Sequence, residues 1–251
     1  MPQPAGTKPP TILFLDTELV AIDKPAHLLS VPGRAPEPSA PDLLRQRPEL
    51  RDNPAVRVVH RLDRDASGVQ VYARTLSAQR HLVAEFVGRR VEKVYFALVS
   101  GYVSGDGEVD LRLAFDRRRD RVIASRSRGK PALTRYHVLQ RLASNTLLEC
   151  HPVTGRMHQI RAHLAAIGHP LTVDPVYGSG SAVLLSQYKT NYRASARRPE
   201  RPLIDRLTLH AGRIQFAHPV TGQPLAIEAP WPKDFRATVN QLGRLVQNQA
   251  Q

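Results

Sequence analysis

The stretch that decides the fold is Val58-Val59-His60-Arg61-Leu62-Asp63-Arg64-Asp65-Ala66-Ser67-Gly68-Val69. An apolar pair leads into charged residues, and a Ser-Gly turn returns the chain to a second apolar run. This pattern predicts a strand, a charged connection and a second strand. Asp63 lies between two arginines in that connection. Its carboxylate is either half of an exposed ion pair, which adds little to stability, or a group that Arg61 or Arg64 keeps ionised and that can act as a nucleophile.

The composition indicates an ordinary globular protein with an unusual charge. The chain has 251 residues, of which 41% are hydrophobic and 23% are charged, so it can bury a sizeable core. Its 36 Lys and Arg against 22 Asp and Glu give a net charge of +14. Neutralising phosphates releases counterions, so this excess favours nucleic acid over a membrane as the partner. A generic basic surface is the alternative.

The single cysteine limits what the chain can build. Cys150 rules out an internal disulfide and every multi-cysteine metal site, and its strand-like surroundings favour a buried, inert thiol. The first residues have no apolar signal region, and no apolar run approaches the ~18 residues of a membrane span. We therefore expect a cytoplasmic monomer without a membrane partner.

Known cofactor motifs are missing from the sequence. His158 and His163 are five residues apart, which on a helix with ~3.6 residues per turn places them roughly 140° apart. A zinc helix has two histidines four apart with a glutamate between them. Walker, G-x-G-x-x-G and G-x-S-x-G patterns do not occur. We expect a protein that uses no metal, nucleotide or redox cofactor.

Short strands with few helices predict an α+β fold. Strands are expected at 11–15, 19–22, 92–99, 109–113, 134–139, 146–150, 207–209, 214–216 and 225–228, and helices at 76–87, 157–168 and 234–246. Without regular βαβ alternation, these elements predict one domain over residues 11–251 around a mainly antiparallel or mixed sheet. A Pro-rich flexible tail precedes it at 1–10, and 178–201 is expected to be a flexible insertion. The sequence His-Pro-Val-Thr-Gly at 151–155 recurs at 218–222 and predicts the same turn twice.

The strongest charge cluster runs from Arg112 to Arg135. It holds nine basic residues against Asp116 and Asp120. It is either a solvated charged loop or a basic ribbon that contacts phosphates. In the second case the contacting side chains are expected to be Arg117, Arg118, Arg119 and Lys130.

Four motifs in order resemble one enzyme family. His60-Arg61-Leu62-Asp63 followed by Ser67-Gly68 resembles the His-Arg-Leu-Asp-x-x-Thr-Ser-Gly signature of the RluA-type pseudouridine synthase family. The other matching stretches are 23–26 with 30–34, then 92–95, then 154–161 through 168–170. Together they cover most of residues 12–178. The chain departs from the family at Ala66, where Thr is usual, and at Met157, where Thr or Ser is usual.

The resemblance implies an isomerase that converts uridine in RNA to pseudouridine. The bond from C1′ to N1 is replaced by one from C1′ to C5, after the uridine has been flipped out of its stack. By this resemblance Asp63 is the catalytic carboxylate, Tyr95 lies against the base, and Arg161 pairs with the aspartate. The expected RNA contacts near the site are His60, Arg61, Arg156 and His158. Whether Asp63 attacks the base, attacks C1′ or takes a sugar proton stays open.

The expected substrate is a structured RNA. Family members often carry an N-terminal S4-type RNA-binding module, and here the catalytic pattern begins near Thr11. The chain is therefore expected to be a compact member that modifies rRNA or tRNA stem-loops. A non-catalytic RNA-binding or RNA-folding protein on the same scaffold is the alternative, and the presence of Asp63, Tyr95 and Arg161 together favours the enzyme.

Overall fold

A computed structural model describes residues 9–33, 37–189, 192–193 and 198–249. The chain forms two compact units. Unit 1 comprises Met1–Lys93 and Ala211–Pro230, and unit 2 comprises Val94–His210 and Trp231–Gln251. Most of the expected tail at 1–10 and part of the expected insertion at 178–201 lie outside the described residues.

Unit 1 is built on an antiparallel sheet. Its main strands are β1 (Thr11–Leu15), β2 (Leu19–Lys24), β4 (Ser67–Ala73) and β11 (Leu209–Ala217), which neighbour one another in that order. β3 (Arg57–Val58) pairs with β4, and β12 (Pro224–Glu228) pairs with β11. The strands expected at 207–209 and 214–216 are not separate elements, because backbone pairing continues through the polar and small residues between them.

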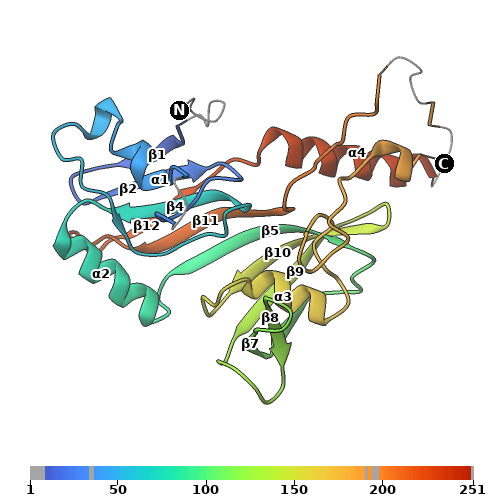
Figure 1. The fold of residues 1–251 in the computed structure, drawn as a ribbon, viewed down its shortest axis with the longest axis horizontal. Helices are drawn as coiled ribbons and strands as arrows, with labels where there is room; N and C mark the ends of the chain where they lie inside the picture. Colours follow the sequence, from blue (N-terminus) through green and yellow to red (C-terminus); the bar gives the residue numbers. More distant parts are fainter. Residues whose placement is uncertain (1–8, 34–36, 190–191, 194–197, 250–251) are drawn as a thin grey trace. The chain divides into compact units, whose positions relative to one another are not determined.

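Helices cover both faces of the unit 1 sheet. Val20, Ile22 and Tyr72 pack on one face with residues of α1 (Ala40–Leu44) and the 3-10 helix η1 (Pro48–Leu50). On the opposite face lies α2 (Leu76–Val87) (Figure 1). Its first turn is capped by the hydroxyl of Thr75, which accepts a hydrogen bond from the backbone of Ala78 at 3.1 Å. The two layers explain why every residue of β4 is buried.

Gly68 is required by the close approach of β11. Its φ is +114°, and a Cβ atom added there would lie 2.1 Å from the backbone oxygen of Ala211. Any side chain at this position would have to displace the neighbouring strand, in addition to adopting a strained backbone. Ser67 and Gly68 belong to β4, so the expected Ser-Gly turn is wrong, and packing is what requires the glycine.

Unit 2 also contains an antiparallel sheet. Its strands are β5 (Glu92–Ser100), β10 (Asn145–Pro152), β9 (Leu133–Leu142) and β6 (Gly107–Asp110), in that order across the sheet. Phe235 and Leu242 of α4 (Lys233–Gln249) pack in one cluster with Leu98 and Leu147 of the strands. The unit also contains α3 (Gln159–Ala166) and a 3-10 helix, η2 (Leu185–Gln187).

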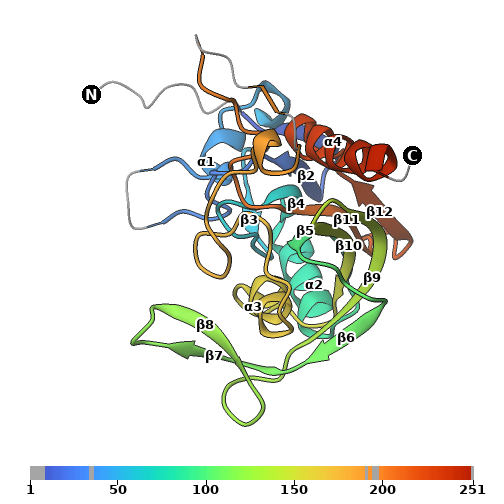
Figure 2. The ribbon, with the colours of Figure 1, turned by 90° about the vertical axis from the view of Figure 1, so that its right-hand side faces the viewer.

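The charged region after β6 forms a separate hairpin. β7 (Arg112–Asp116) and β8 (Arg121–Ser125) make a two-stranded sheet beside α3 (Figure 2). Leu113 and Val122 of the hairpin pack with Ala162 of α3. The strand expected at 109–113 is interrupted at Leu111, which belongs to neither β6 nor β7. The first part of the charge cluster, residues 112–125, is thus a β-ribbon, and Arg126, Arg128 and Lys130 follow it in the connection to β9.

The α+β class with a mainly antiparallel sheet is confirmed by these elements. The predicted helix at 76–87 has the bounds of α2, and the predicted helices at 157–168 and 234–246 correspond to α3 and α4. Within the part of the chain that the structure describes, no helix has the length and apolar character needed to cross a membrane.

Candidate active site and RNA interface

The loop that carries Asp63 is anchored by a buried lysine. Lys24 is 0% exposed. Its Nζ donates hydrogen bonds to the backbone oxygens of Pro25, Leu28 and Arg64, each at 2.9 Å. The lysine belongs to the Asp-Lys-Pro-Ala motif, and Arg64 directly follows Asp63. One sequence motif therefore holds the backbone of another, 40 residues away.

We predict that Lys24→Met destabilises unit 1 and lowers activity. Methionine fills similar space but has no donor, and each buried acceptor left without one costs about 1–3 kcal/mol. The loop around Asp63 would also lose its attachment. Denaturant unfolding and the rate of uridine isomerisation measure the two effects. Lys233→Met, at an exposed position, should change neither. An unfolding midpoint for Lys24→Met equal to that of the wild type would contradict the anchoring role.

Ser30 holds the same loop at Leu62, two residues before Arg64. Ser30 Oγ donates to the backbone oxygen of Leu62 at 2.7 Å and accepts from the backbone N–H of the same residue at 3.0 Å. The backbone oxygen of Ser30 in turn accepts from the Tyr72 hydroxyl at 2.9 Å. This pairing links the motif at 30–34 to the residue before Asp63. Arg34 of that motif lies outside the described residues.

The neutral imidazole of His60 attaches the loop that carries Asp63 to β4 and α2. Its Nε2 accepts a hydrogen bond from the backbone N–H of Val71 at 2.9 Å, and its ring stacks on Phe86 with centroids 4.7 Å apart. Desolvation, with a smaller contribution from Lys93, lowers the pKa of His60 to about 3. A nitrogen that accepts from a backbone N–H carries no proton, in agreement with this shift. Contact between His60 and RNA stays a prediction.

The arginines that flank Asp63 lie on the surface. Arg64 Nη2 is 2.9 Å from Glu37 Oε2, and both side chains are about half exposed. Arg61 is exposed, while Asp63 is half-buried. Arg64 binds the carboxylate of Glu37, and the role of Arg61 or Arg64 toward Asp63 stays a prediction. Such an exposed pair adds little to stability.

Tyr95 lies on β5 in unit 2. Its register partner on β10 is Cys150, and its side chain is half-buried. Cys150 is 0% exposed, and burial raises the pKa of its thiol. The predicted buried cysteine is confirmed. Tyr95 and Arg161 thus belong to unit 2, whereas Asp63 belongs to unit 1.

Arg161 is held by an aspartate that the sequence analysis missed. Arg161 Nε and Nη2 donate to Asp174 Oδ2 and Oδ1, both at 2.8 Å. The two side chains are 6% and 0% exposed. Asp174 Oδ1 also accepts from the backbone N–H groups of Val176 and Tyr177. The only signal for this residue was an acid after the apolar run at 171–173, and no spacing rule connects it to Arg161.

Tyr177 connects α3 to the basic hairpin. Its ring centroid lies 5.2 Å from the guanidinium carbon of Arg161 and 5.8 Å from that of Arg121. Its hydroxyl donates to the backbone oxygen of Val122 on β8 at 2.9 Å. His158 Nδ1 lies 3.2 Å from the same hydroxyl and acts as the donor, because the single phenolic hydrogen is used at Val122. Sequence analysis missed Tyr177 as well.

The remaining polar residues of the motif at 154–163 stabilise the fold. Gln159 Oε1 accepts from the Thr154 hydroxyl at 2.7 Å, and Gln159 Nε2 donates to Thr134 Oγ1 at 3.0 Å. His163 is fully buried, with its ring nitrogens 3.0 Å from Thr134 Oγ1 and from the backbone oxygen of Leu111. Burial lowers the pKa of His163. Among the described residues, no group of three or more His, Cys, Asp or Glu side chains is arranged to hold a metal ion.

The other expected RNA contacts lie near the hairpin. Arg117, Arg118 and Arg119 form its exposed turn, which Asp116 Oδ1 closes by accepting from the backbone of Arg118 at 2.9 Å. Lys130 is exposed and forms a β-bridge with Leu113. Arg156 Nε donates to the backbone oxygen of Pro131 at 3.3 Å. The structure therefore gathers the four hairpin cations, Arg156 and His158 within unit 2.

Comparison with known proteins identifies the family. A family model described as RNA pseudouridylate synthase matches residues 18–166. The chain belongs to this family. The "Ribosomal large subunit pseudouridine synthase D" of Nitrosomonas europaea is 40% identical over 242 residues, which cover 94% of this chain and 66% of that protein. The protein of the same name from Xanthomonas campestris is 39% identical over 93% of this chain and 70% of its own length.

Solved structures support the pseudouridine synthase fold. "Human RNA Pseudouridylate Synthase Domain Containing 1" matches with a TM-score of 0.69 at 24% identity, covering 92% of this chain and 86% of that one. A second solved structure, "Human RNA Pseudouridylate Synthase Domain Containing 4", matches with a TM-score of 0.67, also at 24% identity. The resemblance drawn from the four motifs is confirmed by the family model and the curated relatives. The chain spans 59–70% of the length of the first three curated relatives.

The pseudouridine synthase match covers the three expected catalytic residues, because Asp63, Tyr95 and Arg161 all lie between 18 and 166. Asp174 and Tyr177, which contact Arg161, lie beyond the matched residues. The residues that set the position of Arg161 are therefore outside the residues that the family model matches.

Proposed function

We propose that this protein isomerises uridine to pseudouridine in ribosomal RNA, with Asp63 as the catalytic carboxylate. The observation that carries the proposal is the family match over residues 18–166, which includes Asp63, Tyr95 and Arg161. The roles of these three residues come from the resemblance of their motifs to those of the family. The relatives named for the large ribosomal subunit favour rRNA over tRNA as the substrate.

The proposed reaction is balanced without a co-reactant. The bond from N1 to C1′ breaks, the base turns, and C5 bonds to C1′; C5 then loses its hydrogen as a proton and N1 gains one. An ionised Asp63 serves either as a nucleophile or as a base for a sugar proton. Tyr95 lies against the base.

In this proposal Arg161 supplies the positive charge that keeps Asp63 ionised. A guanidinium has five N–H donors in a fixed plane. The bonds to Asp174 use Nε and Nη2. The buried pair with Asp174 supports the role of Arg161, because it fixes the plane of the guanidinium.

The substrate is tested by mapping pseudouridines in RNA from cells with and without the protein. We expect one or a few large-subunit rRNA positions to lose pseudouridine in its absence and to regain it when purified protein is added to the unmodified RNA. Unchanged rRNA with altered tRNA would correct the substrate, and unchanged RNA of both kinds would contradict the proposed activity.

The exposed hairpin turn is proposed to bind phosphates. Replacing Arg117, Arg118 and Arg119 with Ala should weaken RNA binding and flatten the dependence of log Kd on log salt by about 0.7–0.9 for each phosphate that the variant no longer binds. Filter binding at several salt concentrations measures the slope.

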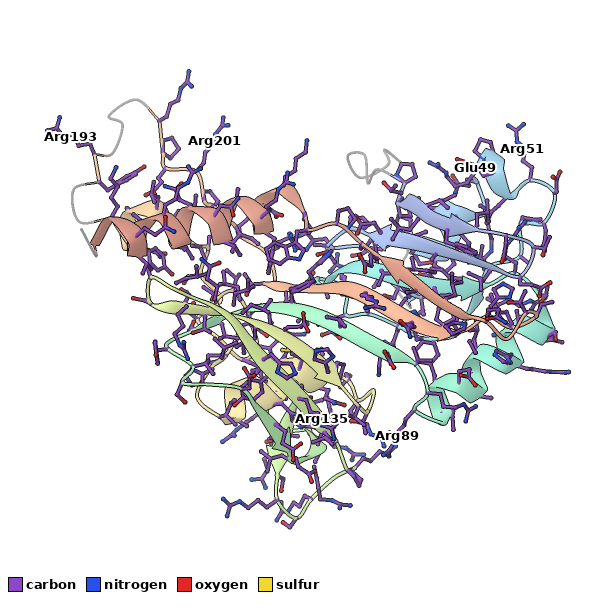
Figure 3. The ribbon with its side chains drawn as sticks, turned by 180° about the vertical axis from the view of Figure 1, so that it is seen from behind. Glu49, Arg51, Arg89, Arg135, Arg193 and Arg201 are labelled. Carbon is purple, nitrogen blue, oxygen red and sulfur yellow. The ribbon has the colours of Figure 1, made fainter. Side chains whose placement is uncertain are left out.

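A matched control removes the same charge elsewhere. Arg45 and Arg47 form exposed ion pairs with Asp42 and Glu49, and Arg51 projects from the same region of unit 1 (Figure 3). Replacing these three arginines with Ala should leave the slope near its wild-type value. If the hairpin variant keeps the wild-type slope, the turn is only solvated, and the exposed Arg193 and Arg201 become the next candidates (Figure 3).

A further inference from the structure

Phe115 is an exposed aromatic residue at the outer end of the hairpin. Its side chain is 52% exposed, whereas its cross-strand partner Val122 is 4% exposed and Leu113, two residues back along β7, is 6% exposed. Residues that alternate along a strand share a face, so Phe115 continues the apolar face that packs against α3. Phe115 is not part of the cluster that Leu113 and Val122 form with α3, and its ring is open to solvent.

Phe115 stands next to the basic turn of the hairpin. Three exposed arginines follow one residue after it in the turn, and Arg121 opens β8 on the other side. Asp116 is occupied in closing the turn, where its Oδ1 accepts from the backbone of Arg118 and Arg119. An aromatic face surrounded by cations is how proteins bind unpaired nucleotides: the base stacks on the ring while the cations follow the phosphates.

The hairpin presents this ring in a fixed position. Val122, opposite Phe115, accepts through its backbone oxygen from the Tyr177 hydroxyl at 2.9 Å. Arg121 Nη1 donates to the backbone oxygen of Val176, also at 2.9 Å. Both bonds tie β8 to the turn that holds Arg161. A binding surface ordered before its ligand arrives loses less entropy on binding.

We propose that Phe115 is a stacking platform for one unpaired RNA base. This inference rests on the proposed function and narrows its substrate: the target uridine has an unpaired nucleotide within reach of the hairpin, as in a loop or bulge. A protein partner fits less well, because the exposed apolar surface near the turn is a single aromatic side chain beside three exposed arginines in the sequence, and protein interfaces need a larger desolvated core.

The test compares Phe115→Ala with Phe115→Trp. Stacking on an aromatic ring contributes ~1–3 kcal/mol per base, so Phe115→Ala should raise Kd for the modified stem-loop about 5- to 150-fold. Stacking releases no counterions, so the salt slope should stay at the wild-type value, unlike that of the arginine variants. Phe115→Trp should bind like the wild type, and a fully paired RNA of equal length should bind wild type and Phe115→Ala equally.

Tyr102 gives a matched control. It is an exposed aromatic residue, 66% accessible, whose ring lies 4.8 Å from the guanidinium carbon of Arg141 and outside the hairpin. Tyr102→Ala should leave the Kd unchanged. Wild-type binding by Phe115→Ala, equal weakening by Phe115→Trp, or a flattened salt slope would each overturn the inference. Failure of the wild type to modify RNA would instead contradict the proposed function, so the two failures are distinguishable.

Discussion

Asp63→Asn is expected to abolish uridine isomerisation while RNA binding persists. The substitution preserves the size of the side chain but removes the negative charge that both possible catalytic routes require. Contacts to phosphates generally supply most of the affinity for RNA, and the ones proposed for this protein are made by the hairpin turn. Pseudouridine formation under single-turnover conditions and the Kd for the same RNA measure the two properties.

Asp65→Asn is the control for this result. Asp65 lies two residues further along the same loop, where its Oδ1 pairs with His27 Nδ1 at 2.9 Å on the surface. Loss of an exposed pair costs about 1 kcal/mol or less, and turnover should remain near that of the wild type. Near-normal pseudouridine formation by Asp63→Asn, or equal damage from both substitutions, would remove Asp63 from its proposed role.

Asp174→Asn is expected to cause the largest loss of stability. Arg161 and Asp174 are both buried, and removing one charge leaves the other without compensation in a poorly solvated place. Breaking such a pair costs about 3–5 kcal/mol of unfolding free energy. The guanidinium would also lose its fixed plane, so isomerisation should slow even at temperatures where the variant is folded. Denaturant unfolding and single-turnover assays measure the two effects.

Asp234→Asn tests whether burial of the carboxylate is the reason for the large loss of stability expected of Asp174→Asn. Asp234 binds Arg206 with the same two-bond geometry, at 2.6 and 2.7 Å, but its side chain is 38% exposed. Arg206 is 7% exposed, as buried as Arg161, but the carboxylate that this substitution neutralises is partly solvated and contributes less attraction to the pair. The loss of stability should therefore be smaller, and activity should be unchanged. If Asp174→Asn costs no more than Asp234→Asn, burial does not decide the strength of the Arg161 pair.

Local pattern determined most of the elements. The four-residue spacing of Ala78, Leu82 and Phe86 predicted α2 at its observed bounds, and short strand-like runs at 11–15, 134–139 and 146–150 predicted β1, β9 and β10. These signals are readable because the period of side chains along a helix or strand is set by backbone geometry alone. Errors arose where that signal is weak: at 109–113, where two strands meet, and within β11, which small and polar residues interrupt.

The candidate site was readable only where its residues stand in contiguous motifs. Asp63, Tyr95 and Arg161 were identified from such motifs, but the groups that hold them were not. Arg161 binds an aspartate 13 residues away, and Lys24 binds a carbonyl oxygen 40 residues away. Sequence spacing carries no information about such pairs, because folding and not chain proximity brings the two groups together.

The repeated His-Pro-Val-Thr-Gly sequence shows most directly what the sequence determines and what only the tertiary structure decides. At 151–155 the histidine lies in β10 and its Nε2 is 2.8 Å from Glu149 Oε1. At 218–222 the histidine Nδ1 accepts from the backbone of Val220 and Thr221, its Nε2 lies 2.8 Å from Asp16 Oδ2, and the glycine has a φ of +67°. The expected common turn is wrong. The sequence by itself determined that strands end near these positions and that the chain carries the family's motifs. Only the tertiary structure decided which partner each histidine meets, because Asp16 is 202 residues from His218 and reaches it through the fold.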